Sequence, residues 1–246
     1  METAFSKQQY ELFYPPGIEN HWWTLARNKL LSDILRSDSE ATDSLLEVGC
    51  GRGVVVQNLY DEGFDIHGVE LADVRPLACV GARVDSGTDV FEWRPELRTQ
   101  VTGLLLLDVI EHLPEVEPFL KKLGVTFPNL SLVVVTVPAR KEIGSNYDAV
   151  VGHYRRYSLE MLEQLAANVG WPVGRTGYFF RVSYLPMRLM AMLGVNRNTH
   201  FKSPGKVMQH LHRIVSRVCT LEQRVLPGRV RGSSAYAVYH PTGGVG

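Results

Sequence analysis

The chain has 246 residues, of which 45% are apolar and 21% are charged. This composition is typical of a folded globular protein with its own core, and it excludes extended disorder. Lys plus Arg and Asp plus Glu both total 26, so the net charge is zero and nucleic acid is not an expected partner.

Three cysteines lie far apart, at Cys50, Cys79 and Cys219, and form no C-x-x-C pair. We therefore expect free thiols in a reducing, cytoplasmic compartment and predict no metal site. The first nine residues lack the basic and apolar regions of a signal peptide. The longest apolar stretch, residues 178–195, carries two arginines, so we expect a protein that is soluble or binds a membrane only at its surface.

The first third of the chain alternates helical and strand patterns. Residues 1–20 show no period, whereas apolar residues three and four positions apart predict a helix over residues 21–36. Short apolar runs predict strands over residues 45–48 and 66–70. Between them, residues 54–62 predict a helix that Gly63 ends.

The remaining elements follow the same alternation. Apolar runs predict buried strands over residues 101–110 and 131–137, and Ser158 is expected to cap a helix that reaches Val169. Residues 175–183 and 234–240 predict two late strands. Short strands that alternate with helices predict a doubly wound α/β fold with a mostly parallel sheet, whose ligand binds at the carboxyl ends of the strands.

A glycine-rich loop joins the first predicted strand to a helix. Gly49, Gly51 and Gly53 allow a tight turn and close approach of a ligand to the backbone. A dinucleotide fingerprint, G-x-G-x-x-G, would need glycine at position 54, which is Val54, so a nicotinamide-dependent oxidoreductase is disfavoured. Glu70 ends the next strand, where a carboxylate accepts hydrogen bonds from a ribose diol.

A second motif, Asp108-Val-Ile-Glu-His-Leu-Pro114, follows another predicted strand. Over about residues 20–183 the chain resembles the class I S-adenosylmethionine-dependent methyltransferases. The second motif is similar to the D-V-x-E-H-L run of the small-molecule branch that includes the ubiquinone-pathway O-methyltransferases. The Asn/Asp-Pro-Pro-aromatic run of nucleic-acid amino-methyltransferases is absent, which argues against nucleic-acid bases as acceptors.

This resemblance implies a Rossmann-like, mostly parallel seven-stranded sheet with a helical N-terminal cover, to which the pattern of the chain adds a helical insertion before the last strand. It also implies S-adenosylmethionine as the cofactor. Glu47 and the glycine loop would flank its methionine part, Glu70 would hold the ribose hydroxyls, and Leu71 would pack on adenine. Asp89 would face the adenine amine, a role for which Asp85 competes. The residues that the resemblance assigns to the cofactor are Arg27, Glu47, Gly49, Cys50, Gly51, Gly53, Glu70, Leu71, Asp89, Val90 and Asp108.

Two histidines are candidates for a base that removes a proton from the methyl acceptor. His112 follows the carboxyl end of a strand, and an unperturbed histidine has a pKa of about 6.5, which suits proton removal near neutrality. Its alternative role is to cap or orient its own loop. His153 lies in a segment, residues 152–157, that resembles the loop closing over the acceptor in the same branch.

Four further residues are assigned to the acceptor. Arg155 and Arg156 suit an anionic group of the acceptor, or else acids that lock their own loop, and Tyr157 is grouped with them. Trp23 belongs to a segment with a counterpart in the family's cofactor-covering helix. It would wall off the acceptor or belong to the core, while Arg27 would pair with the cofactor's carboxylate.

A basic insertion lies between the two late strands. Residues 184–231 hold nine Lys or Arg and one acid, whereas the rest of the chain holds 17 Lys or Arg and 25 acids. Residues 207–226 predict a basic helix with an apolar face, which suits an anionic membrane, a lid on the acidic remainder, or a homodimer interface. A lid or dimer is favoured because docking of a helix needs an apolar face.

We therefore expect a single methyltransferase domain over residues 1–246. It would consist of an N-terminal cover (1–40), a cofactor-binding core (41–183), the basic insertion (184–231) and a final strand with its tail (232–246). The predicted activity is methyl transfer from S-adenosylmethionine to an oxygen of a small molecule. A non-catalytic module that binds the same cofactor is an alternative, beside the disfavoured oxidoreductase.

Overall fold

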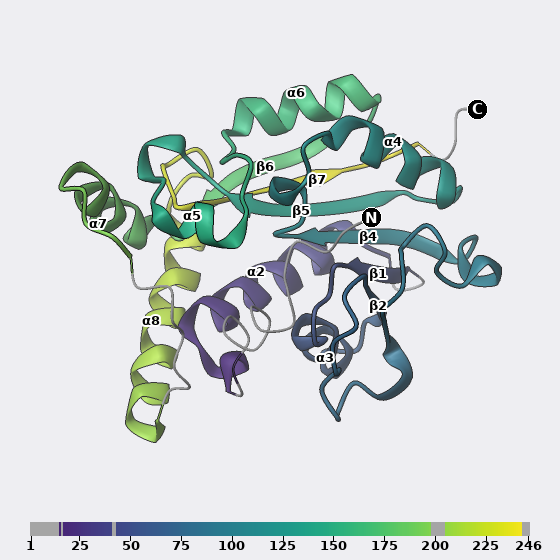
Figure 1. The fold of residues 1–246 in the computed structure, drawn as a ribbon, viewed down its shortest axis with the longest axis horizontal. Coiled ribbons are helices and arrows are strands. Elements are labelled where there is room, and N and C mark those ends of the chain that lie inside the picture. Colours follow the sequence, from purple (N-terminus) through teal and green to yellow (C-terminus); the bar gives the residue numbers. More distant parts are fainter. Residues whose placement is uncertain (1–14, 16, 41–42, 198–204, 243–246) are drawn as a thin grey trace.

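A computed structural model describes residues 15, 17–40, 43–197 and 205–242 of the chain. At its centre is a seven-stranded sheet in the order β3-β2-β1-β4-β5-β7-β6 (Figure 1). Neighbouring strands from β3 to β5 are parallel, and β7 runs antiparallel to both β5 and β6. This confirms the predicted doubly wound, mostly parallel sheet. The strands are β1 (Ser44–Val48), β2 (Asp65–Glu70), β3 (Val84–Ser86), β4 (Val101–Leu107), β5 (Leu132–Pro138), β6 (Val173–Phe179) and β7 (Ser234–Tyr239).

The central strands are aliphatic because both faces of the sheet are covered. The last five residues of β4 and the first six of β5 are all buried. Continuous apolar runs of this kind are typical of parallel strands between two layers of helices. Because β1, β2, β4 and β5 are parallel, their carboxyl ends meet at one edge of the sheet, where the predicted motifs lie.

Helices cover the two faces of the sheet separately (Figure 1). The hydrophobic core on one face includes residues of α4 and α6, and that on the other includes residues of α2 and α3. α8 packs along α2. The helices are α2 (Trp22–Asp38), α3 (Val54–Asp61), α4 (Val116–Thr126), α5 (Asn146–Val151), α6 (Leu159–Val169), α7 (Arg181–Met192) and α8 (Lys206–Val225). Short 3₁₀ turns span Ile18–Asn20, Gly81–Arg83, Pro95–Leu97, Ile110–His112 and Lys141–Ile143.

Several helix ends lie where local signals predicted them. The His21 ring accepts a hydrogen bond from the Trp23 N–H at 3.3 Å, at the start of α2. The Ser158 hydroxyl accepts from the Met161 N–H at 3.3 Å, at the start of α6. Gly63 follows α3 with a φ of 93°, a conformation that glycine adopts at no steric cost. These contacts confirm three of the predicted boundaries.

The predicted strand over residues 175–183 is wrong at its carboxyl end. β6 stops at Phe179, and Phe180 has a φ of 56°, after which α7 begins at Arg181. The Glu222 carboxylate of α8 accepts hydrogen bonds from the first two N–H groups of α7, at 2.6 and 2.8 Å. The cap of α7 therefore comes from a distant residue, which a local pattern does not reveal. The helical insertion begins three residues earlier than predicted.

α8 docks on the protein through a face of small and polar side chains. Ser216, Cys219 and Glu222 are buried on this face. Six aliphatic residues on another face stay at least 46% exposed: Val207, Leu211, Ile214, Val218, Leu221 and Val225. We call these six the α8 aliphatic stripe. The expectation that α8 would dock on this chain through its apolar face is therefore wrong, whereas its role in a homodimer interface stays a prediction.

Of the helices that the structure describes, none has the length and hydropathy needed to cross a bilayer.

Candidate active site

The glycine loop after β1 can be built only from glycines at its key positions. Gly49, Gly51 and Gly53 have φ values of 73°, 55° and 83°, in the left-handed region that side chains rarely adopt. A Cβ atom at Gly53 would lie 2.8 Å from a methyl group of Val84. The Cys50 side chain packs into the core below, so only its backbone belongs to the surface of the loop.

Glu70 braces this loop from the end of β2. Its two carboxylate oxygens accept hydrogen bonds from the N–H groups of Gly51 at 2.8 Å and Ala72 at 2.9 Å. Each oxygen of a carboxylate has a second lone pair, so the group can still accept bonds from hydroxyls. The backbone contacts fix the direction in which Glu70 presents these lone pairs.

Glu47 is a buried acid next to the loop. Its side chain lies in β1, and its Oε2 atom has no hydrogen-bond partner among the described residues. Burial raises the pKa of Glu47 to about 8, and the nearby positive charge of Arg27 opposes the rise. A buried acid with one free oxygen fits a positively charged or hydrogen-bonding ligand group.

Arg27 reaches from α2 to the end of β4. Its Nη1 atom lies 2.6 Å from Oδ2 of Asp108, and its guanidinium stacks on Trp23 at 4.2 Å from the ring centroid. Asp108 has a φ of 56°, which turns the chain sharply after the strand. Trp23 also lies close to Phe180, with ring centroids 6.1 Å apart. α2 thus covers this edge of the sheet, although Arg27 is already paired with an acid of the same chain.

The structure separates the two acids that compete for the adenine amine. Asp85 accepts a hydrogen bond from the Trp93 indole at 2.6 Å and forms an ion pair with the neighbouring arginine, Arg94, at 2.8 Å. One carboxylate oxygen of Asp89 accepts a hydrogen bond from the backbone N–H of the residue two positions later, at 2.9 Å. Asp85 is therefore committed to its neighbours. Leu71 is half-buried beyond β2, and Val90 is buried. The adenine contacts of Leu71, Asp89 and Val90 stay predictions.

Two histidines and two acids gather where β4 and β5 end. The His153 Nδ1 atom lies 2.8 Å from Oδ1 of Asp148, and its Nε2 atom lies 3.9 Å from Oε1 of Glu111. The rings of His112 and His153 meet edge to face, with centroids 4.9 Å apart. Burial, helped by His153, lowers the pKa of His112 to about 4, so this imidazole is neutral at pH 7.

Hydrogen bonds tie the loop after β4 to the loop after β5. The Tyr154 N–H donates to the Glu111 carbonyl at 2.8 Å, and the Tyr157 hydroxyl donates to the Ile110 carbonyl at 3.2 Å. Tyr157 is 3% exposed, so its ring is part of the core. These bonds hold His112 and His153 at a fixed separation.

The neighbouring arginines stabilise the same two loops. Arg155 donates to the Pro114 carbonyl at 2.5 Å, and Arg156 donates to both oxygens of Asp148 at 2.9 and 3.0 Å. The structure therefore gives both arginines a role in fixing the loops. Contact of Arg155, Arg156 or Tyr157 with an acceptor stays a prediction.

A family model described as a methyltransferase domain matches residues 22–174, which include the glycine loop, Glu70 and both histidines. The chain belongs to this methyltransferase family. As the sequence predicted, it is a class I, S-adenosylmethionine-dependent enzyme by family and fold. The similarity to the ubiquinone-pathway branch stays a prediction.

Solved structures share the fold of this methyltransferase at low sequence identity. A SAM-dependent methyltransferase from Archaeoglobus fulgidus has a TM-score of 0.52 and 19% identity, over 87% of this chain and 94% of that one. The phosphoethanolamine N-methyltransferase 2 of Haemonchus contortus has a TM-score of 0.54 and 16% identity, over 97% and 57%. The geranyl diphosphate C-methyltransferase of Streptomyces coelicolor A3(2) has a TM-score of 0.51 and 14% identity, over 87% of this chain and 75% of that one. No curated protein is significantly similar in sequence.

The residues of this methyltransferase fit S-adenosylmethionine at the glycine loop. The loop keeps its course only because Gly53 lacks a Cβ, which would meet the Val84 side chain, and Glu70 keeps lone pairs for ribose hydroxyls. The unpartnered oxygen of Glu47 suits the amino group of the methionine part. Of the predicted cofactor residues, Cys50 and Val90 have side chains that pack in the two hydrophobic cores.

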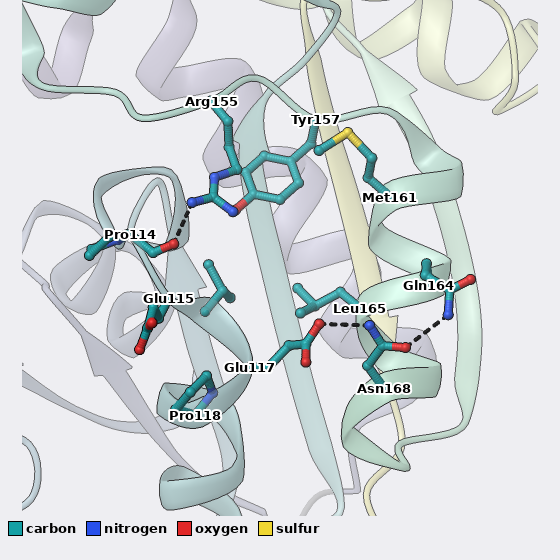
Figure 2. Close-up of a pocket in the computed structure, with 11 residues that line it drawn as sticks. Pro114, Glu115, Glu117, Pro118, Arg155, Tyr157, Met161, Gln164, Leu165 and Asn168 are labelled. Atoms are coloured by element: carbon teal, nitrogen blue, oxygen red, sulfur yellow. Dashed lines mark hydrogen bonds between the residues drawn. The ribbon is translucent and has the colours of Figure 1, made fainter.

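A hollow of about 520 Å³ lies elsewhere, between α4 and α6 (Figure 2). Arg155 and Pro114 border one end of it, and a hydrogen bond of 2.6 Å from Asn168 to Glu117 crosses it further along. None of the glycine-loop residues lines it. This hollow is therefore separate from the predicted cofactor site.

Two acids of the histidine cluster were not predicted from the sequence. Asp148 has a local signal, because Ser145 and Asp148 form a capping box at the start of α5. Glu111 is part of the second motif, but its burial in contact with His153 depends on the pairing of two loops. The sequence therefore placed the histidines and missed the acids that surround them.

Proposed function

We propose that this methyltransferase transfers a methyl group from S-adenosylmethionine to an oxygen of a small molecule. The observation that supports an oxygen acceptor is the contact of His153 with Asp148, beside His112. A hydroxyl loses its proton as its oxygen bonds to the methyl carbon, and a neutral imidazole is a suitable base for this step. The cluster lies at the sheet edge that also carries the glycine loop and Glu70.

His153 is the better placed of the two bases. When its Nδ1–H donates to Asp148, its Nε2 atom carries a lone pair, and Arg156 holds Asp148 in place. The acceptor proton passes to Nε2, the acceptor oxygen bonds to the methyl carbon, and the bond from that carbon to sulfur breaks. S-adenosylmethionine supplies the methyl group on a positively charged sulfur, which leaves as a neutral thioether. Asp148 acts as a positioning residue.

Transfer of radiolabelled methyl groups to a panel of phenols and other hydroxyl compounds tests this proposal. We expect His153→Ala and Asp148→Asn to lower kcat at least 100-fold for any accepted compound while S-adenosylhomocysteine still binds. The control is His210→Ala, an exposed histidine on α8. Full activity of His153→Ala would overturn the base assignment. Transfer to amines but to no hydroxyl would overturn the oxygen acceptor.

We further propose that α7 and α8 contact an anionic lipid surface. Of the 21 large apolar residues that are exposed in the described part of the chain, 15 lie between Val182 and Val230, which makes the surface of this region unusually apolar. Exposed arginines Arg213 and Arg217 flank the α8 aliphatic stripe. Among described residues 181–197 and 205–232 the one acid is Glu222, which is buried. A second copy meeting the same surface would therefore offer these arginines no exposed acid, whereas anionic headgroups would.

Flotation with liposomes tests the lipid contact. We expect the chain to float with phosphatidylcholine vesicles that contain phosphatidylserine, and to float less in high salt or as Leu211→Ser/Val218→Ser. Val125→Ser is the matched control, because Val125 is 82% exposed on α4, outside this surface. Absence of flotation, together with a dimer in sedimentation that Leu211→Ser/Val218→Ser dissociates, would overturn the lipid contact in favour of a second copy.

A further inference from the structure

Glu111 is a buried acid that the proposed methyl transfer does not use, and burial raises the pKa of its carboxyl group. Its side chain is fully buried, and neither carboxylate oxygen has a hydrogen-bond partner among the described residues. Burial of an acid without a partner costs several kcal/mol, so such a group in a folded protein calls for an explanation. Arg27 and Arg156 act on it only from a distance, since no ion pair links either of them to Glu111 among the described residues.

Two imidazoles lie close to this carboxylate. Glu111, His112 and His153 each offer one ligand atom, and these atoms lie within 4.8 Å of one another. The closest measured approach is 3.9 Å, from Oε1 of Glu111 to Nε2 of His153. The described residues form one such group of three. Two imidazoles and a carboxylate are a ligand set that Zn²⁺ and similar transition-metal ions bind in proteins.

His153 is also oriented as a metal ligand would be. Its Nδ1 atom contacts Asp148 at 2.8 Å, which leaves Nε2 directed toward Glu111. A carboxylate on the outer nitrogen of a histidine is the common support of a metal-bound imidazole, because it fixes the ring and makes the ligand nitrogen more basic. Arg156 in turn holds both oxygens of Asp148. The support is therefore in place in the protein alone.

We propose that Glu111, His112 and His153 bind one divalent transition-metal ion of the Zn²⁺, Co²⁺ and Mn²⁺ type. Ligand atoms around tetrahedral Zn²⁺ are about 3.3 Å apart, so the three atoms need to approach by roughly an ångström. Side-chain rotation on the two loops is enough for this, and the hydrogen bonds between Tyr154, Tyr157 and the 110–111 backbone keep the loops together. Three protein ligands leave at least one coordination position for another molecule.

The consequence for catalysis rests on the proposed function. A hydroxyl on the open position of the ion ionises more readily, and its proton leaves to solvent. Its oxygen then bonds to the methyl carbon as the bond from carbon to sulfur breaks. With the ion bound, His153 would be a ligand and would not accept the proton, and the ion would promote its loss by lowering the pKa of the acceptor hydroxyl. Metal binding itself needs neither S-adenosylmethionine nor an acceptor.

Titration of EDTA-treated protein with Co²⁺ tests the site without any methyl transfer. We expect one Co²⁺ per chain by calorimetry, visible d–d absorption that saturates with it, and displacement by Zn²⁺. Glu111→Gln, which keeps the size of the side chain, should weaken binding at least tenfold. Asp148→Asn should weaken it about 10–100-fold through the orientation of His153. Glu115→Gln, an exposed acid of the same loop, is the control and should bind as the original protein does.

Each outcome of the titration either supports or overturns the metal site. No saturable Co²⁺ signal, or equal affinity in Glu111→Gln and Glu115→Gln, would overturn the site. If Glu111→Gln does not fold, as judged by circular dichroism, anomalous diffraction from Zn²⁺-soaked crystals decides. A peak between Glu111, His112 and His153 supports the proposal, and no peak there overturns it. Metal binding with no methyl transfer to any hydroxyl would overturn the oxygen acceptor and leave the metal site standing.

Discussion

Glu47 places a carboxyl group in the interior, below the glycine loop. It is 3% exposed, and burial raises its pKa from 4.5 to about 8 against the opposing charge of Arg27. Between these two pH values the folded protein holds a proton that the unfolded chain has lost. The native state therefore binds more protons, so the free energy of unfolding falls as pH rises from 4.5 to about 8 and then levels off.

Replacement of Glu47 by glutamine should remove this pH dependence. We expect Glu47→Gln to gain stability over the original protein on going from about pH 5 to about pH 8, by on the order of 1–4 kcal/mol. Urea unfolding in the absence of ligands at both pH values measures it, with the exposed Glu92→Gln as the control. A stability difference that stays constant with pH would contradict the burial of an ionisable Glu47.

Residues at the glycine loop were predictable because their chemistry is local. Gly53 is followed by Val54, which excludes one nucleotide fingerprint, and Glu70 is placed simply by ending the next strand. Glu111 was not predictable as a site residue, since its isolation from hydrogen-bond partners arises only when two loops meet. The same holds for Arg155, whose contact is a backbone carbonyl 41 positions away.

At the scale of elements, α7 depends on another helix for its start. Phe180 precedes it and makes no side-chain cap. The Glu222 carboxylate of α8 instead accepts hydrogen bonds from the N–H groups of Arg181 and Val182. A carboxylate at the N-terminus of a helix satisfies free N–H groups and interacts favourably with the helix dipole. α7 and α8 are therefore coupled through this one side chain.

Removal of that carboxylate should loosen α7. We expect Glu222→Ala to lower the free energy of unfolding by about 1–3 kcal/mol, because two buried N–H groups lose their acceptor. Hydrogen exchange of the α7 amides, compared with those of α6, shows whether the loss is local. The exposed Glu115→Ala is the control. Unchanged exchange in α7 would contradict the capping role.

Two of the elements that the sequence did not predict, β3 and α5, are short. β3 (Val84–Ser86) has three residues, too few to show alternation, and pairs only with β2. α5 is six residues long, and its signal is the capping box of Ser145 and Asp148 rather than a period. The docked face of α8 was also not predictable, since its polar residues are buried against α2 while its aliphatic residues are left exposed.

At the scale of the whole molecule, the basic insertion is separate from the acidic part of the chain that carries the candidate site. The sheet, the glycine loop and the histidine cluster lie in the part that is acidic overall, and the family match to residues 22–174 covers the glycine loop, the histidine cluster and strands β1 to β5. The basic insertion adds α8 along α2 and α7 next to α8 (Figure 1). Most of the exposed large apolar residues among the described residues lie in this insertion. The fold was predictable from alternation and the two motifs, whereas the outward face of the insertion required the packing of α8 to be known.

The central claim is that the loop after β1 holds S-adenosylmethionine, and calorimetry with S-adenosylhomocysteine tests it most directly. We expect one site per chain, no binding of NADH, and loss of binding in Gly53→Ala, whose Cβ would lie 2.8 Å from Val84 at a φ of 83°. Gly205→Ala, where nothing lies within 4 Å, should bind normally. If Gly53→Ala does not fold, Glu70→Gln takes its place as the test variant, and it should weaken binding at least tenfold. No heat with S-adenosylhomocysteine, or full affinity in folded Gly53→Ala, would contradict the claim.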